Sequence, residues 1–168
     1  MVNNTIISDI ITEEDGRQIC RVILPVDPST ISTAQQKKFD PRSRRFFTNS
    51  KVAKGKKIIS LLARTCAAKV RSVISDTEPV ELRMAFLYSY PKGTPKKNCI
   101  HLAPMPSGAD CDNRAKAPID ALGEAGWWED DRIITLAMLA KARTTQNPCI
   151  VILVSKAQKK DINSLYHL

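Results

Sequence analysis

Carboxylates and a lysine recur at regular spacings in the segment 110–131. Asp110 and Asp112 are two residues apart, and in an extended segment such residues face the same side, so both carboxylates can converge on one cation. Lys116 and Asp120 follow Asp112 at four-residue steps, which predicts one shared helix face. Oxygen ligands select Mg²⁺ or Mn²⁺ over zinc, and a lysine can neutralise a scissile phosphate. The spacing predicts a site for metal-assisted phosphodiester hydrolysis.

Two other interpretations of these carboxylates need weighing. An EF-hand loop also begins Asp-x-Asp, but it requires Gly at its sixth position and Glu at its twelfth. Here those positions hold Ala115 and Ala121, so an EF-hand is excluded. Asp112 could instead cap a helix while the other acids are solvated, and the spacing alone leaves that alternative open.

Charge is distributed unevenly along the chain, which carries a formal net charge of +9. The segment 37–57 is strongly basic, whereas 110–131 is acidic. A basic surface around an acidic pocket suits a protein that holds a polyanion and binds metal cations; the alternative is a solvated, unspecific surface. The residues predicted to bind DNA are Lys37, Lys38, Arg42, Arg44, Arg45, Lys51, Lys54, Lys56, Lys57, Lys96 and Lys97.

Hydrophobic patterning predicts the elements that must position these residues. We expect a β-hairpin from 5–12 and 19–26, followed by a loop over 25–41 that continues into the basic stretch. A helix over 50–75, a half-buried strand over 79–90 and a loop over 91–106 come next. The chain then continues with a helix over 113–125, strands over 133–141 and 149–154, and a short or frayed helix over 156–168. Gly126 suits the C-terminal position of the second helix. This is an α/β (α+β) chain, predicted to form a single domain over residues 1–168.

Composition narrows the remaining classes. The 168 residues suffice for one core, and 43% of them are hydrophobic, so wholesale disorder is not expected. Five cysteines without a CxxC pair predict free thiols rather than a disulfide framework or a zinc site. No apolar run is long enough for a membrane helix, and the acidic N-terminal segment is unlike a secretory signal. We therefore expect a cytoplasmic protein.

A longer pattern surrounds the acidic residues. It reads Asp110-x-Asp112-Asn113-x-x-Lys116-x-x-x-Asp120-Ala121-Leu122, then Ala125-Gly126-Trp127-Trp128-x-Asp130-Asp131, then Ile133-Ile134. This pattern resembles the core of the RusA family of Holliday junction resolvases, which occur in bacteria and their phages. The resemblance is close over 110–141. It is looser over the early strand, the basic loop, the helix over 50–75 and the strand over 79–91.

The resemblance implies a specific activity and assembly. It implies a small mixed sheet packed with two main helices, working as a homodimer. It also implies Mg²⁺- or Mn²⁺-dependent, paired symmetric incision of four-way DNA junctions in recombination and repair. The family's metal-binding acids fall on Asp110, Asp112 and Asp131 and its catalytic lysine on Lys116, while Asp120 and Asp130 match acidic positions that support the ligands. Two alternatives are a non-catalytic junction-binding protein and a nuclease for other branched DNA.

Three departures from the family pattern concern the site. Pro118 lies inside the predicted helix, where proline removes a hydrogen bond and favours a kink. Residues 107–109 lack the bases that many relatives carry there, and the preceding loop is longer than in the shortest relatives. A helix over 113–125 would rise on the order of 20 Å. Asp131 could therefore reach Asp110 and Asp112 only through a shorter or bent helix, or it could be supplied by a partner subunit.

Two aromatic pairs have different expected roles. Arg44-Arg45-Phe46-Phe47 interleaves charge and rings, which suits phosphate contacts and stacking on unpaired bases, or an anchor of the loop to the core. Trp127 and Trp128 precede the acidic pair Asp130-Asp131, and we expect them to pack helix against sheet. The apolar stripe of the strand over 79–90 is expected in the core or in a dimer interface.

Overall fold

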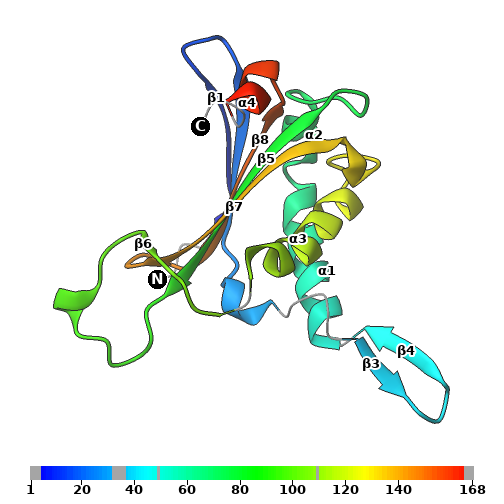
Figure 1. The fold of residues 1–168 in the computed structure, drawn as a ribbon, viewed down its shortest axis with the longest axis vertical. Helices are drawn as coiled ribbons and strands as arrows, with labels where there is room; N and C mark the ends of the chain where they lie inside the picture. Colours follow the sequence, from blue (N-terminus) through cyan, green and yellow to red (C-terminus); the bar gives the residue numbers. More distant parts are fainter. Residues whose placement is uncertain (1–4, 32–36, 49, 109, 165–168) are drawn as a thin grey trace.

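A mixed six-stranded sheet forms the centre of the molecule (Figure 1). The computed structural model describes residues 5–31, 37–48, 50–108 and 110–164, without the side chains of 37–40, 45–48 and 51. The strand order is β1-β2-β8-β5-β7-β6. The strands are β1 (Ile7–Thr12), β2 (Gln18–Leu24), β5 (Val80–Ser89), β6 (Ala103–Pro104), β7 (Ile134–Thr144) and β8 (Cys149–Lys156). The predicted α+β class with a mixed sheet is confirmed.

The central strand β5 follows the predicted alternation. Val80, Leu82, Met84, Phe86 and Tyr88 are all buried on the face that the helices cover. On one side β5 pairs antiparallel with β8, and on the other it pairs parallel with β7. A parallel neighbour requires a crossover connection, and the helix between β6 and β7 supplies it.

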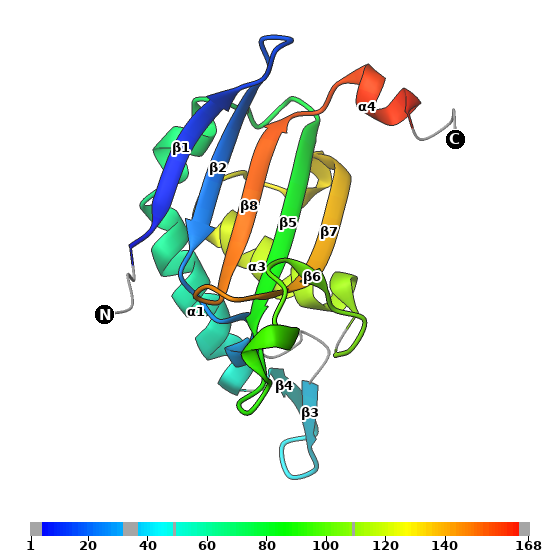
Figure 2. The same ribbon diagram turned by 90° about the vertical axis from the view of Figure 1, so that its left-hand side faces the viewer.

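Two helices, α1 (Ser50–Arg64) and α3 (Cys111–Glu124), pack against each other and cover one face of the sheet (Figures 1 and 2). The predicted continuous helix over 50–75 is wrong in one respect, because the chain breaks after Arg64 and resumes as α2 (Ala67–Arg71). The Ala63 carbonyl accepts hydrogen bonds from the backbone of Cys66 and from Nε1 of Trp127, and Thr65 bonds the Leu62 carbonyl. These bonds satisfy groups that a helix end would otherwise leave unpaired.

Helix α3 runs without interruption through Pro118, which is buried against the core. The helix begins at Cys111, two residues earlier than the predicted start at residue 113. Gly126 follows it in the left-handed region with φ of 81°. A Cβ there would lie 2.8 Å from Nη2 of Arg71, so both the backbone conformation and the space favour glycine.

The basic loop predicted after residue 25 is partly a hairpin. After the short 3-10 helix η1 (Pro28–Thr30), strands β3 (Lys37–Asp40) and β4 (Arg45–Thr48) pair antiparallel and project from the end of the molecule (Figure 1). The sequence hides this hairpin because the strands are only four residues long. The loop over 91–106 contains the 3-10 helix η2 (Lys96–Asn98), and α4 (Lys159–Asn163) lies near the end of the chain.

The cysteines and the apolar segments were the subject of two expectations from composition. All five cysteines are free, with Cys20 and Cys66 buried and the others half-buried, as predicted. Burial raises the pKa of the Cys20 thiol to about 11, so it behaves as an apolar core group. Among the described residues, no helix is long and apolar enough to cross a membrane.

Candidate functional site

Asp110 and Asp112 lie at the N-terminal end of α3. Asp110 is the residue before the first helical turn, with φ of −58° and ψ of 152°, and Asp112 is in that turn. Both are exposed, and within the described residues neither carboxylate has an ion-pair or hydrogen-bond partner. The helix dipole favours negative charge here. Two carboxylates without a partner at one helix end offer only oxygen ligands. Hard divalent cations such as Mg²⁺ bind oxygen ligands.

Lys116 and Asp120 continue the helix face that starts at Asp112. The three are exposed at successive four-residue steps, as the sequence predicted. Their inward neighbours Ala115 and Ala117 are buried. Lys116 has no ion-pair partner among the residues described, so its ammonium group is available to a phosphate.

An arginine holds this end of α3 in place. Nη1 of Arg114 donates to the carbonyls of Pro28 and Ile31, at 3.3 and 2.5 Å. Its guanidinium carbon lies 5.9 Å from the centre of the Tyr88 ring, in cation–π range. Arg114 thereby joins the first turns of α3 to η1 and to the end of β5. This role of Arg114 was not predicted from the sequence. Its four-residue spacing from Asp110 is too weak a signal to reveal it.

A second acidic group lies at the C-terminal end of α3. It borders an open cavity of about 320 Å³ that is lined by Lys56, Ile119, Asp120, Gly123, Glu124, Trp128, Glu129, Asp130 and Asp131. Nζ of Lys56 lies 2.8 Å from Glu124 and 3.6 Å from Asp120. Burial disfavours the Lys56 ammonium, but its hydrogen bond to Glu124 and the charge of Asp120 outweigh this and raise its pKa. One ammonium group therefore offsets part of the charge of Glu124 and Asp120, whereas Asp131 has no ion-pair partner among the described residues.

Asp130 and Asp131 begin the 3-10 helix η3 (Asp131–Ile133). The Asp130 carboxylate caps that helix by accepting the backbone N–H of Arg132 at 2.9 Å and also pairs with the Arg132 side chain. The side-chain hydrogen bond from Arg132 holds the pKa of Asp130 below its ordinary value. Asp130 therefore has a positioning role at the turn that carries Asp131.

The three predicted metal ligands are divided between the two ends of the helix. Asp120 lies two helical turns beyond Asp112, a rise of about 12 Å. Asp131 borders the same cavity as Asp120 and Asp130, and Asp110 does not. In the part of the chain that the structure describes, no three His, Cys, Asp or Glu residues are grouped to hold one ion. The structure thus gives Asp110 and Asp112 as a candidate pair and leaves Asp131 apart.

Trp127 and Trp128 are buried at the C-terminal end of α3, which fits the predicted structural role, but the hydrogen bond that Trp127 makes is to helix α1 rather than to the sheet. Trp127 is fully buried, its Nε1 donates to the Ala63 carbonyl of α1 at 2.9 Å, and the two rings meet edge to face at 6.1 Å. Both rings are therefore unavailable for stacking on DNA. They join α3 to α1 directly before the acidic turn.

The predicted DNA-binding residues occupy two sides of the sheet. Lys54 and Lys57 are exposed on α1, and Arg42 and Arg44 are exposed in the turn of the β3–β4 hairpin, where Arg44 has a φ of 52°. Lys96 and Lys97 lie on η2, which projects from the opposite side of the sheet (Figure 1). The side chains of Lys37, Lys38, Arg45 and Lys51, and those of Phe46 and Phe47, lie outside the described residues.

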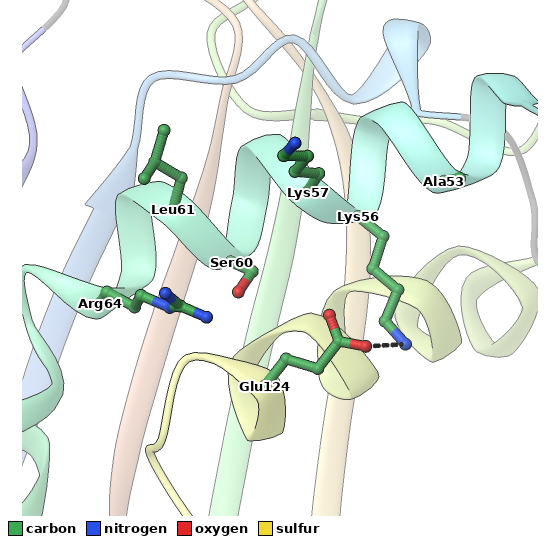
Figure 3. Close-up of a pocket in the computed structure, with 7 residues that line it drawn as sticks. All are labelled: Ala53, Lys56, Lys57, Ser60, Leu61, Arg64 and Glu124. Atoms are coloured by element: carbon green, nitrogen blue, oxygen red, sulfur yellow. Dashed lines mark ion pairs between the residues drawn. The ribbon is translucent and has the colours of Figure 1, made fainter.

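A cavity between α1 and α3 was not predicted from the sequence (Figure 3). It measures about 360 Å³ and is lined by Ala53, Lys56, Lys57, Ser60, Leu61, Arg64 and Glu124. Figure 3 shows Lys56, Ser60 and Arg64 reaching from α1 toward Glu124 of α3. Lys57 and Arg64 are seven residues apart, and that spacing could have placed them on one helix face. The cavity extends the basic surface of α1 along the groove between the helices.

Comparisons with known proteins add one finding. A family model described as Endodeoxyribonuclease RusA matches residues 25–155. The matched region runs from the end of β2 to the end of β8 and includes both acidic groups and α1. A comparison with curated proteins gives no match.

Proposed function

Because the chain belongs to the RusA family of endodeoxyribonucleases, we propose that it resolves Holliday junctions by paired symmetric incision. We propose further that it depends on Mg²⁺ or Mn²⁺, works as a homodimer, and serves DNA recombination and repair. The observation that carries the proposal is the pair of unpartnered carboxylates, Asp110 and Asp112, with Lys116 one turn along the same exposed helix face.

Each residue of this group has a distinct role in the proposed reaction. Mg²⁺ is commonly held by one or two carboxylates together with water and phosphate oxygens, which is what Asp110 and Asp112 can offer. When bound, the ion would polarise the scissile phosphate and lower the pKa of the attacking water. Lys116 would stabilise the negative charge that develops on the phosphoryl oxygens. Arg114 keeps this helix end in position through its bonds to Pro28 and Ile31.

Asp131 remains a proposed metal ligand, with Asp120 and Asp130 as supporting residues. It borders the same cavity as Asp120, which lies about two helical turns beyond Asp112 on α3. We therefore expect Asp131 to serve a second ion position, or to approach the first ion through a shift of the turn 129–133. Asp130 supports either arrangement, because it caps η3 and fixes the start of that turn.

The proposed DNA path follows the exposed cations on the helix side of the sheet. Lys54, Lys57 and Arg64 lie along α1, and the β3–β4 hairpin extends the surface beyond it. Phosphate contacts by such residues orient a duplex without reading its sequence. Residues 44–47 at the hairpin are proposed to contact the junction centre.

The experiment that tests this proposal is cleavage of a synthetic four-way junction, with each strand labelled in turn, in the presence of Mg²⁺. We expect the wild type to make symmetric nicks and Asp112→Asn to bind the junction without cutting it. Glu14→Gln, which removes an exposed charge in the β1–β2 turn, is the matched control and should cut normally. EDTA should stop the reaction, and Mn²⁺ should substitute for Mg²⁺.

Other outcomes separate the alternative functions. A wild type that binds the junction but never cuts it, with either ion, contradicts the nuclease proposal and leaves a junction-binding protein. Equal cleavage of a flap and of a fixed junction indicates a nuclease for branched DNA in general.

A further inference from the structure

Helix α1 exposes apolar side chains as well as cations on its outer side. Leu61 is 66% exposed, and Ile58, which precedes it by one helical turn, is 42% exposed. Single exposed apolar residues are common on protein surfaces. Leu61 is different because it also lines the cavity of about 360 Å³ between α1 and α3. Ala53, which lies about two helical turns earlier, is exposed in the same lining.

The charged side chains of this cavity differ in whether the protein already pairs them. Three of them are cations, Lys56, Lys57 and Arg64, and one is the carboxylate of Glu124, so the lining has a net charge of +2. Lys56 is held by Glu124 at 2.8 Å. Lys57 and Arg64 are exposed and have no ion-pair partner in the part of the chain that the structure describes. These two cations are therefore available to acidic groups of a ligand.

Figure 3 shows how the lining is distributed around α1. Lys57 and Leu61 lie on the side of the helix away from Glu124, whereas Ser60 and Arg64 lie on the side that faces it. Along the helix, Leu61 lies between Lys57 and Arg64, about one turn from each. A ligand that enters the cavity therefore meets an apolar surface with an available cation before and after it along the helix.

Two classes of macromolecule carry the negative charge that such a surface attracts. A DNA duplex presents phosphates along its backbone, which pair with cations but offer little apolar surface to cover Leu61. An acidic peptide with a bulky apolar side chain offers both kinds of contact: carboxylates for Lys57 and Arg64, and an apolar group for Leu61. The exposed leucine among available cations therefore favours the peptide.

We propose that the cavity between α1 and α3 is a docking site for an acidic peptide segment of a protein partner, anchored by a bulky apolar side chain. The anchor packs on Leu61 inside the cavity, and acidic residues on either side of the anchor pair with Lys57 and Arg64. The volume of about 360 Å³ lies at the small end of the range for ligand sites, which suits one or two side chains. Docking of such a peptide does not require nuclease activity.

Lys57 and Arg64 also lie on the proposed DNA path. An acidic peptide on α1 and a DNA arm would therefore compete for the same cations, and the bound peptide would lower the affinity for a four-way junction. This consequence, unlike the docking itself, rests on the proposed function.

The test measures binding by fluorescence anisotropy of a labelled octapeptide in which Phe-Leu is flanked on both sides by aspartates. A matched peptide has Ser-Ser in place of Phe-Leu, and a short labelled DNA duplex is the nucleic-acid probe. We expect wild type to bind the Phe-Leu peptide with a micromolar dissociation constant. It should bind the Ser-Ser peptide at least about tenfold more weakly, because only the first peptide has an apolar anchor.

Protein variants separate the apolar contact from the charge. Leu61→Ser should weaken binding of the Phe-Leu peptide at least about tenfold and leave duplex affinity unchanged, because the leucine carries no charge. Lys57→Gln combined with Arg64→Gln should weaken binding of both peptides. Ile100→Ser is the matched control and should bind like wild type, because Ile100 is 67% exposed and is not part of the cavity lining. Urea unfolding checks that each variant is folded.

Absence of binding to the Phe-Leu peptide, or equal affinity of wild type for the two peptides, would overturn the proposal. A Leu61→Ser variant that binds the Phe-Leu peptide as tightly as wild type would also contradict it. Variants that lose duplex binding and keep peptide binding would assign this surface to nucleic acid instead. Junction cleavage tests the nuclease proposal separately, and its failure would leave the peptide measurements unaffected.

Discussion

The two ends of α3 both carry acidic residues, but they differ in what the protein already supplies to them. At the N-terminal end, Asp110 and Asp112 have no cationic partner within the described residues. At the C-terminal end, Lys56 lies between Asp120 and Glu124. A metal ion would have to compete with the Lys56 ammonium group for these two carboxylates. Carboxylates without such a partner have their charge available to bind one.

The two ends also differ in how they are attached. Trp127 and Trp128 bury their rings between α3 and α1, so the C-terminal end is part of the core. The N-terminal end is held by the polar contacts of Arg114 and by the small buried side chains of Ala115 and Ala117. A binding site at the less buried end can accept a substrate without disturbing the core. This contrast predicts that substitutions at the two ends affect different properties.

The largest expected contrast is between Asp112→Asn and Asp120→Asn in junction cleavage. Loss of a metal ligand removes several kcal/mol of transition-state stabilisation, so Asp112→Asn should slow single-turnover cleavage about a thousand-fold. Asp120→Asn should slow it less than about tenfold, since Asp120 is paired with Lys56. Equal losses in both variants would show that the two ends form one metal site when DNA is bound.

The next contrast is between the lysines of the two ends. Lys116→Ala should slow cleavage about a hundred-fold with little change in junction affinity, because its proposed role lies in the transition state. Lys56→Ala removes a partly exposed ion pair and should cost at most about 1 kcal/mol of stability, with cleavage nearly unchanged. Single-turnover rates and urea unfolding measure the two effects. A strong cleavage defect in Lys56→Ala would mean that the catalytic residues lie at the C-terminal end of α3, which contradicts the proposal.

Stability should respond most at the anchored end. Trp127→Phe removes a buried hydrogen bond to the Ala63 carbonyl as well as ring volume, at a cost of about 1–3 kcal/mol in unfolding free energy. Trp128→Phe removes similar volume without a hydrogen bond found in the described part of the chain, so it should cost less. Urea denaturation of the two variants gives the difference directly. The reverse order would mean that ring packing, not the hydrogen bond, attaches this end.

The smallest effect concerns DNA binding at the hairpin. Replacing Arg44 and Arg45 together by alanine should weaken junction binding and reduce the slope of log affinity against log salt by up to about two, if each contacts a phosphate. Fluorescence anisotropy at several salt concentrations measures this slope. The double variant in which Lys96 and Lys97 are both replaced by alanine, measured in the same way, tests whether the opposite side of the sheet contributes to DNA binding. A slope unchanged by the arginine substitutions excludes phosphate contact by that pair.

Most of the fold follows from local sequence patterns. The alternation of β5, the apolar pattern of α1 and the helix-ending glycine Gly126 each depend on neighbouring residues, and the structure confirms the corresponding elements. The break between α1 and α2 does not, and the Ala63 carbonyl at this break accepts a hydrogen bond from Trp127, which lies more than sixty residues away. The β3–β4 hairpin was missed because its strands are too short to show a period.

For the candidate site, the sequence alone determined which residues could do chemistry and placed Asp112, Lys116 and Asp120 on one helix face, since helical spacing is a local property. Only the tertiary structure decided which carboxylates share an ion pair with a lysine. Lys56 comes from another helix, and the turn that carries Asp131 is placed by packing of Trp127 and Trp128 against α1. Distances between elements depend on how their faces pack, and residue spacing in the chain does not encode them.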